Sequence, residues 1–194
     1  MTLGHQVIEE YFPNSFICYV SDCWASQLKT AAQGHQLCLA HLLRELLNFE
    51  KALDNAWCIR MNELLHRALA LKKSLTPEDY NHPPEEILTL NKELDGLLKV
   101  DTSVFHPKLQ ALVKRLVKQR ESVFRFLTHP DIPPDNNASE RAIRNVKVKT
   151  KVSGQFRNVE GKGADRFARL RSVIDTTVKN GREVYTALQT LATC

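Results

Sequence analysis

Residues 133–144 read Pro133-Pro134-Asp135-Asn136-Asn137-Ala138-Ser139-Glu140-Arg141-Ala142-Ile143-Arg144. Two prolines end the preceding segment, and the Asp/Asn cluster offers caps for a helix that begins here. Glu140 follows Asn137 by three residues, which is the spacing of a capping box. The stretch also places this acid beside two arginines at the start of a basic segment, so its chemistry depends on whether a second acid exists elsewhere.

That second acid is Asp22. The apolar run 16–20 is short and partly aromatic or β-branched, which is typical of a strand covered on both faces, and it ends at Ser21-Asp22. The sequence then predicts a helix over 24–32, closed by Gly34 in the left-handed cap conformation. Residues 35–40 are either a second strand or the opening of the next helix. This order predicts a parallel α/β layer with Asp22 at the carboxyl end of a strand, where such sheets place ligand groups.

From His41 to Leu127 the apolar residues recur with helical period throughout, and Thr76-Pro77-Glu78-Asp79 is expected to restart a helix. The stripes are interpreted as core and not as a cofactor site. The predicted fold class is therefore mainly α with a small α/β part. The expected divisions are 1–40 for the α/β layer, 41–130 for a helical insertion and 131–194 for a closing helical part.

Positive charge is concentrated after the opening stretch. Residues 141–171 hold ten Lys/Arg and two Asp/Glu, which gives +8, whereas the rest of the chain carries −3 of the total +5. This distribution predicts a polyanionic partner, nucleic acid before membrane. Valines and lysines alternate over 146–152, which fits a strand or a helix, and 153–163 is expected to be a loop. The DNA-binding candidates are Arg141, Arg144, Lys147, Lys149, Lys151, Arg157 and Lys162.

Five cysteines without paired spacing indicate reduced thiols, and no segment resembles a leader or a membrane helix, so we expect a cytoplasmic protein with no membrane partner. Cys38 and His41 have a C-x-x-H spacing. A zinc site would need a second well-spaced ligand pair, which the sequence lacks, so Cys38 is interpreted as a buried small hydrophobe. Asp22 and Glu140, in contrast, offer the oxygen ligands that Mg²⁺ prefers.

Several motifs together resemble bacterial insertion-sequence transposases of the sixty-six family. The stretch from Asp135 to Arg144 resembles the family's glutamate motif, and Ser21-Asp22-Cys23-Trp24 resembles its second-acid strand end. Cys38-x-Ala40-His41-x-x-Arg44 and Thr176-x-x-Lys179-Asn180-Gly181 resemble two further family patterns in the same order.

The resemblance implies a DDE-type catalytic domain with an RNase H-like fold, here truncated and carrying a large all-helical insertion. It implies that Asp22 and Glu140 are the second and third acids of the triad and ligate Mg²⁺ or Mn²⁺. No residue before Val20 matches the first acid, so we expect a C-terminal portion of a transposase that is inactive alone and lacks its metals unless the site is completed.

Two functions follow from these observations. The first is a transposase or transposase fragment that cuts and joins element-end DNA, with a full-length transposase or other element-encoded proteins as partners. The alternative is a non-enzymatic nucleic-acid-binding protein or regulator derived from a transposase, which would use the basic segment alone.

Overall fold

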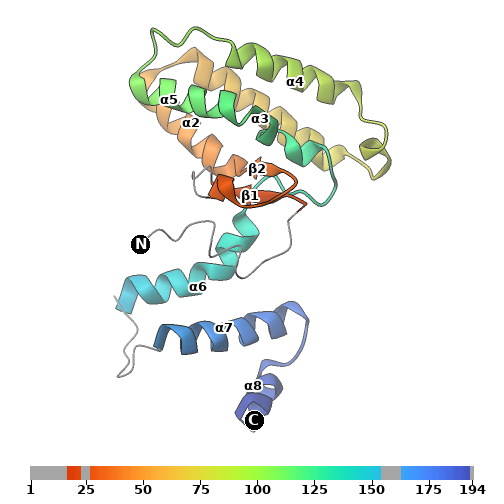
Figure 1. The fold of residues 1–194 in the computed structure, drawn as a ribbon, viewed down its shortest axis with the longest axis vertical. Helices are drawn as coiled ribbons and strands as arrows, with labels where there is room; N and C mark the ends of the chain where they lie inside the picture. Colours follow the sequence, from red (N-terminus) through yellow and green to blue (C-terminus); the bar gives the residue numbers. More distant parts are fainter. Residues whose placement is uncertain (1–16, 23–26, 154–162, 193–194) are drawn as a thin grey trace. The chain divides into compact units, whose positions relative to one another are not determined.

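A computed structural model of the 194-residue chain describes residues 17–22, 27–153 and 163–192 (Figure 1). The described part is mainly helical and contains a two-stranded parallel sheet, which confirms the predicted class of mainly α with a small α/β part. The chain divides into two compact units, Met1–Asn136 and Asn137–Cys194, called here the first and second unit.

The sheet pairs β1 (Tyr19–Ser21) with β2 (His35–Leu37) in parallel, with Tyr19 opposite His35 and Ser21 opposite Leu37. The first strand was predicted over 16–20, and its described portion ends one residue later. The chain leaves β2 and enters a helix almost at once, so both alternatives for residues 35–40 apply to part of that segment.

Two predictions about the connection between the strands were wrong. The helix expected over 24–32 is, in its described portion, only the 3-10 turn η1 (Gln27–Lys29). Gly34 does not have the left-handed φ expected of a helix cap. A Cβ at Gly34 would lie 2.6 Å from Nε of Arg125, so the glycine instead makes room for that guanidinium.

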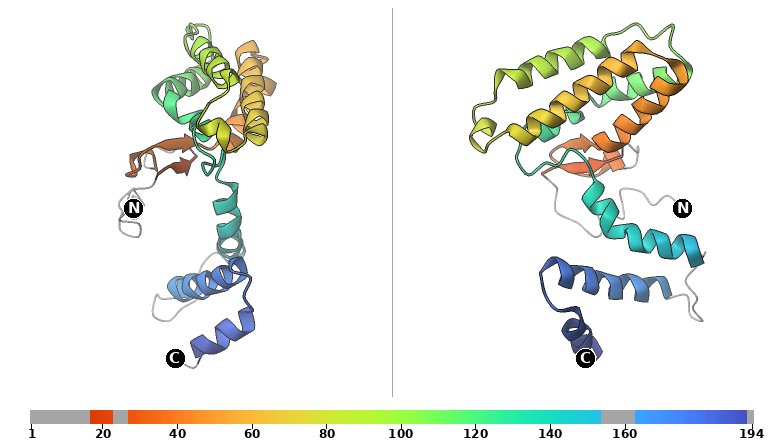
Figure 2. Two further views of the ribbon diagram at one scale, coloured as in Figure 1. Left: turned by 90° about the vertical axis from the view of Figure 1, so that its right-hand side faces the viewer. Right: turned by 180° about the vertical axis from the view of Figure 1, so that it is seen from behind.

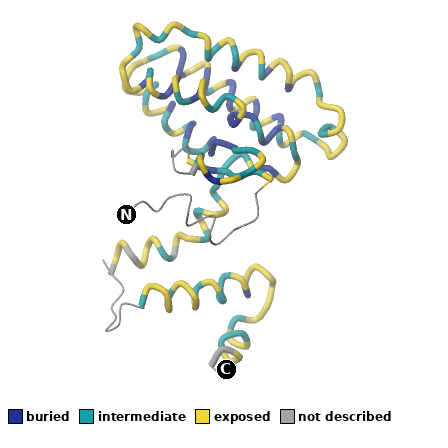
Figure 3. Tube along the Cα trace, in the orientation of Figure 1, coloured by how far each residue is buried: buried dark blue, intermediate teal, exposed yellow. Residues whose placement is uncertain are grey.

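Four α-helices form the body of the first unit and pack in sequence, α2 on α3, α3 on α4 and α4 on α5 (Figures 1 and 2). Their bounds are Leu39–Leu53, Ala56–Ser74, Glu85–Leu98 and Pro107–Lys118. The predicted stripes supply the core, and the buried positions follow the inner faces of these helices (Figure 3). Leu46, Leu65 and Leu90 are fully enclosed.

The predicted helical period is broken where 3-10 turns take over. Thr76–Asp79 does not restart an α-helix, since only the turn η2 (Glu78–Tyr80) forms before α4. After α5 the chain folds into η3 (Arg120–Ser122) and η4 (Arg125–Leu127). These short turns bring Val123 and Phe126 back to β2, where both contact Gln36.

Gln36 connects the sheet to these turns from within the core. Its side-chain amide donates hydrogen bonds to the carbonyls of Val123 (3.1 Å) and Leu37 (2.7 Å), and its carbonyl oxygen accepts one from the amide of Phe126 (2.7 Å). A buried polar side chain is stable only when it is bonded in this way. Gln36 thereby fixes the strand against a segment about ninety residues later in the chain.

The second unit contains α6 (Asn137–Ser153), α7 (Gly163–Lys179) and α8 (Val184–Ala192). Residues 146–152 are helical, which settles the alternative that their alternating pattern left open. The loop expected over 153–163 lies almost entirely outside the described residues. The predicted stop at Asn180-Gly181 is confirmed, and Gly181 has the positive φ of 63° that favours glycine at a helix end.

Candidate metal centre and basic helix

Asp22 directly follows β1, as the sequence predicts. Its Oδ1 accepts a hydrogen bond of 2.5 Å from the side-chain amide of Asn136 and lies 3.3 Å from Nδ1 of His41. The Asp22 side chain is 37% exposed and that of His41 is 30% exposed. The carboxylate is therefore held from two directions and still open to solvent.

Cys38 lies between β2 and α2 and is fully buried, which confirms the interpretation of this residue as buried. Its thiol donates to Oδ1 of Asn136 at 3.0 Å, and its Sγ lies 3.3 Å from Nδ1 of His41. The backbone N–H of Asn136 donates to the same sulfur at 3.5 Å. Asp22, Cys38, His41 and Asn136 together are called the Asp22 cluster.

Backbone hydrogen bonds explain why these residues meet. The N–H of Cys38 donates to the carbonyl of Ser21 at 2.8 Å, which continues the parallel pairing to the end of both strands. The N–H of Leu39 donates to the carbonyl of Pro134 at 2.9 Å, which brings the segment that ends at Asn136 to the start of α2. His41, in the first turn of α2, contacts both Asp22 and Cys38.

Burial sets the electrostatics of the cluster. It raises the pKa of the Cys38 thiol, and the Asp22 charge adds to that rise, while backbone N–H groups directed at the sulfur lower the pKa in part. The pKa of Tyr19 is also raised by burial and by the Asp22 charge. The thiol therefore stays protonated at neutral pH, as its donated hydrogen bond requires.

Glu140, the predicted third acid, lies in the first turn of α6. Residues four, seven and eleven positions later share its face of a helix. These positions are Arg144, Lys147 and Lys151, all exposed, and together with Glu140 they are called the α6 stripe. A carboxylate and three cations thus lie along one side of a single rigid element.

The helix separates residues that a strand would have kept together. In a strand Lys147, Lys149 and Lys151 would all point to one face, but in α6 Lys149 lies on the side opposite the α6 stripe. Arg141 is exposed at the edge of the stripe. The remaining DNA-binding candidates, Arg157 and Lys162, lie outside the described residues.

The donor types decide which cations these groups suit. Asp22 and Glu140 offer carboxylate oxygens, which are the ligands of Mg²⁺ and Mn²⁺. The Cys38 sulfur and His41 nitrogen are not ligands that Mg²⁺ selects. By type, the two acids fit the divalent cations that the sequence resemblance implies, whereas Cys38 and His41 fit a softer cation.

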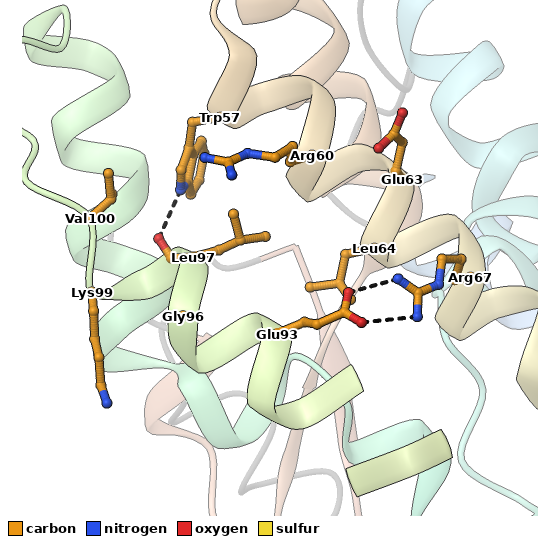
Figure 4. A pocket seen from close by; sticks show the side chains of 10 residues that line it. All are labelled: Trp57, Arg60, Glu63, Leu64, Arg67, Glu93, Gly96, Leu97, Lys99 and Val100. Atoms are coloured by element: carbon orange, nitrogen blue, oxygen red, sulfur yellow. Dashed lines mark hydrogen bonds and ion pairs between the residues drawn. The ribbon is translucent and has the colours of Figure 1, made fainter. Parts of the chain in front are cut away.

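A separate pocket of about 470 Å³ lies between α3 and α4 (Figure 4). The polar groups at its wall include pairs that already satisfy each other. Trp57 Nε1 donates to the carbonyl of Leu97 at 2.9 Å, and Arg67 makes two hydrogen bonds to Glu93, at 2.7 and 3.1 Å. We therefore assign the pocket to the packing of the helical body.

Sequence reasoning proposed Asp22 and Glu140 as site residues but did not single out Asn136, which contacts both Asp22 and Cys38. It also kept Cys38 and His41 apart from the acid, because ligand spacing along the chain does not show that a strand end brings in a third donor. The one available signal was that the motif with Asp22 and the motif with Cys38 and His41 follow each other among the family patterns in the sequence.

No helix in the described ranges is long and apolar enough to span a membrane. A family model described as Transposase IS66 family matches residues 4–164. No curated protein and no solved structure matches the chain.

Proposed function

Because the chain belongs to the IS66 family of transposases, we propose that it acts in DNA transposition, with Asp22 and Glu140 as the second and third acids of a DDE triad. The observation that carries the proposal is the family match, which spans both acids. Support comes from the position of Asp22 after a parallel strand, where α/β sheets place catalytic groups. The finer assignment is an RNase H-like fold with a helical insertion between the two acids.

The two carboxylates would hold Mg²⁺ or Mn²⁺. When bound, such ions activate a water or a 3′-hydroxyl for attack on a phosphodiester and stabilise the leaving oxygen. The chain's own part is to present oxygen ligands on fixed elements. Asp22 is fixed by its bond from Asn136, and Glu140 is fixed by the first turn of α6.

The α6 stripe is the proposed contact with the backbone of element-end DNA. Lysine and arginine neutralise phosphates without reading sequence, so this contact supplies affinity and position. Arg144 lies one helical turn after Glu140 and Lys147 about two turns after it, so the cations continue along the helix from the acid. A full-length transposase or another element-encoded protein is the proposed protein partner.

DNA binding is tested by titrating the purified chain with labelled duplexes at several salt concentrations. We expect affinity to fall steeply with salt, and Lys147→Gln to weaken binding and reduce the slope of log K against log salt by about one. Lys149→Gln, on the other side of α6, should have a smaller effect. Lys114→Gln, an exposed lysine of α5, is the control outside the basic segment.

Each outcome has a distinct meaning. A flat salt response would contradict phosphate contact altogether. Equal losses for Lys147→Gln and Lys149→Gln would keep DNA binding but contradict the assignment to one face of α6.

The catalytic assignment is tested by nicking and strand transfer on element-end DNA with Mg²⁺ or Mn²⁺. We expect Asp22→Asn and Glu140→Gln each to abolish any metal-dependent activity that the chain shows, alone or with the proposed protein partner. Metal-dependent activity that persists in either variant would contradict the assignment of these two acids.

The second candidate function is a non-enzymatic regulator that binds DNA in competition with a transposase. It is favoured by the +8 charge of residues 141–171, because this charge can bind DNA phosphates without the catalytic acids. A regulator would keep its effect on transposition when Asp22→Asn and Glu140→Gln are combined. A contributor to catalysis would lose it.

A further inference from the structure

Three potential metal donors of the first unit converge on one point. The Asp22 carboxylate, the Cys38 sulfur and the His41 ring nitrogen each offer one atom, and these atoms all lie within 4.8 Å of one another. His41 Nδ1 is 3.3 Å from both of the other two. Ligands at ordinary zinc bond lengths around a tetrahedral ion are roughly 3.4 to 3.6 Å apart, so the spacing resembles three corners of one coordination sphere.

The chemistry of the donors selects the cation. A thiolate and an imidazole are ligands for Zn²⁺ and related borderline ions, whereas Mg²⁺ and Ca²⁺ take oxygen. A set of one sulfur, one nitrogen and one carboxylate therefore favours an ion of the Zn²⁺ class over the hard cations. Adding the carboxylate to the C-x-x-H pair supplies the third ligand that spacing along the chain did not reveal.

The surroundings of the three donors fit a ligand site as well. The amide of Asn136 bonds to Asp22 at 2.5 Å and to Cys38 at 3.0 Å, and its backbone N–H points at the Cys38 sulfur. Outer groups of this kind orient metal ligands, and an N–H directed at sulfur favours its ionised form. Asp22 and His41 remain partly exposed, which leaves an open side for entry and for a fourth ligand.

From this geometry we propose that Asp22, Cys38 and His41 form a binding site for a divalent cation of the Zn²⁺ class, with the side chain of Asn136 supporting the ligands. Binding replaces the thiol proton of Cys38 by the metal and releases that proton to solvent. The inference goes beyond the proposed action on DNA and does not depend on it. A carboxylate has two oxygens, so a cation held here does not prevent Asp22 from ligating a second ion.

The competing explanation is a hydrogen-bond network that never takes a metal. In that case the Cys38 thiol keeps its proton and donates a hydrogen bond to Oδ1 of Asn136. The two explanations differ in one observable, which is whether the sulfur forms a bond to an added cation.

The test is a titration of the metal-stripped full chain with Co²⁺ under reducing conditions, followed by absorption spectroscopy. We expect a thiolate-to-cobalt charge-transfer band and the visible bands of four-coordinate cobalt, saturating at one ion per chain. Zn²⁺ should remove these bands, and a large excess of Mg²⁺ should not.

Variants assign the ligands. Cys38→Ser should abolish the charge-transfer band, and His41→Gln and Asp22→Asn should each weaken Co²⁺ binding by about tenfold or more. Cys18→Ser is the matched control, a half-buried thiol of the same unit outside the cluster, and its spectrum should equal that of the parent. If Cys38→Ser fails to fold by circular dichroism, His41→Gln still decides the question, because His41 is partly exposed.

Absence of the charge-transfer band in the parent chain, or its persistence in Cys38→Ser, would overturn the proposal. So would unchanged affinity in His41→Gln. The readout is the absorption of the ion and needs no DNA, so failure here and failure of the DNA-binding test are separate results.

Discussion

The two units of the chain use their apolar residues differently. In the first unit α2 to α5 enclose leucines such as Leu65 completely, and the core continues into the turns around Phe126. In the second unit the described helices leave large apolar side chains such as Val148, Leu170 and Val178 exposed, and Thr177 is the one described residue there that is buried. The first unit is thus organised by burial, whereas the second presents a charged helix surface.

This contrast teaches where function can reside. A densely packed core tolerates little change, so it serves to fix the ends of β1 and α2 in place. The second unit carries the net positive charge of the chain, +7 for residues 137–194 against −2 for residues 1–136, and its described helices enclose little surface. We expect the largest effects from substitutions that disturb core packing, and the smallest from changes in the protonation of single side chains.

Leu65→Ala should have the largest effect on stability. Leu65 is 0% exposed in α3, so the cavity left by truncation should lower the free energy of unfolding by about 2–5 kcal/mol in chemical denaturation followed by circular dichroism. The same substitution at Leu170, which is 48% exposed in α7, should change it by about 0.5 kcal/mol or less. Similar losses at both positions would remove the contrast.

Gln36→Leu should follow in size. The substitution leaves the amide of Phe126 and the carbonyl of Val123 without their partner, and each buried unpaired group costs about 1–3 kcal/mol. Gln33→Leu, at an exposed position before the same strand, is the control. Equal denaturation midpoints for the two variants would show that the sheet is not anchored through Gln36.

Helix caps allow a matched comparison of the two units. Asn55 accepts a hydrogen bond of 2.9 Å from the N–H of Trp57 at the start of α3, and Asn55→Ala should cost about 1 kcal/mol of global stability. Glu183 accepts bonds from the N–H groups of Tyr185 and Thr186 at the start of α8. Glu183→Ala should speed hydrogen exchange in α8 alone, measured by mass spectrometry. A smaller change in the global unfolding midpoint for Asn55→Ala than for Glu183→Ala would contradict this order.

Acidification should affect the first unit before the second. Burial lowers the pKa of His35 from 6.5, so the unfolded chain binds the proton more readily and stability falls as pH drops below about 6.5. Hydrogen bonds from Thr186 and Tyr185 lower the pKa of Glu183 from 4.5, so its contribution is lost only below about pH 4.5.

Hydrogen exchange measured between pH 7 and pH 4 should therefore show loss of protection in β2 before α8. His35→Gln should remove the earlier step, because its side chain does not titrate. Simultaneous loss in both regions would show that the two units do not respond separately.

The sequence predicted the elements that depend on local pattern. The apolar stripes of α2 to α5 and the stop at Asn180-Gly181 follow from period and from glycine, and Asp22 was correctly expected at a strand end. The fate of residues 146–152 could not be decided, since alternating Val and Lys fit two periods. Helical continuation from Asn137 is what separates Lys149 from Lys147.

Contacts between distant segments were beyond sequence reasoning. The role of Gly34 depends on Arg125, and the Asp22 cluster depends on Asn136, in each case across about ninety residues or more. No local pattern encodes such pairs, because they are set by how the helical body returns the chain to the sheet. The proposed metal site therefore becomes visible only after folding.

The bond between Leu39 and Pro134 also has a consequence for biosynthesis. Helices α2 to α5 can begin to pack as they leave the ribosome, since each contacts the next along the chain. The Asp22 cluster must wait for Asn136, which is 98 residues after Cys38. A nascent chain paused before that point would hold Cys38 and Asp22 without this partner, so the hydrogen bonds that support the proposed metal site form only after Asn136 has been translated.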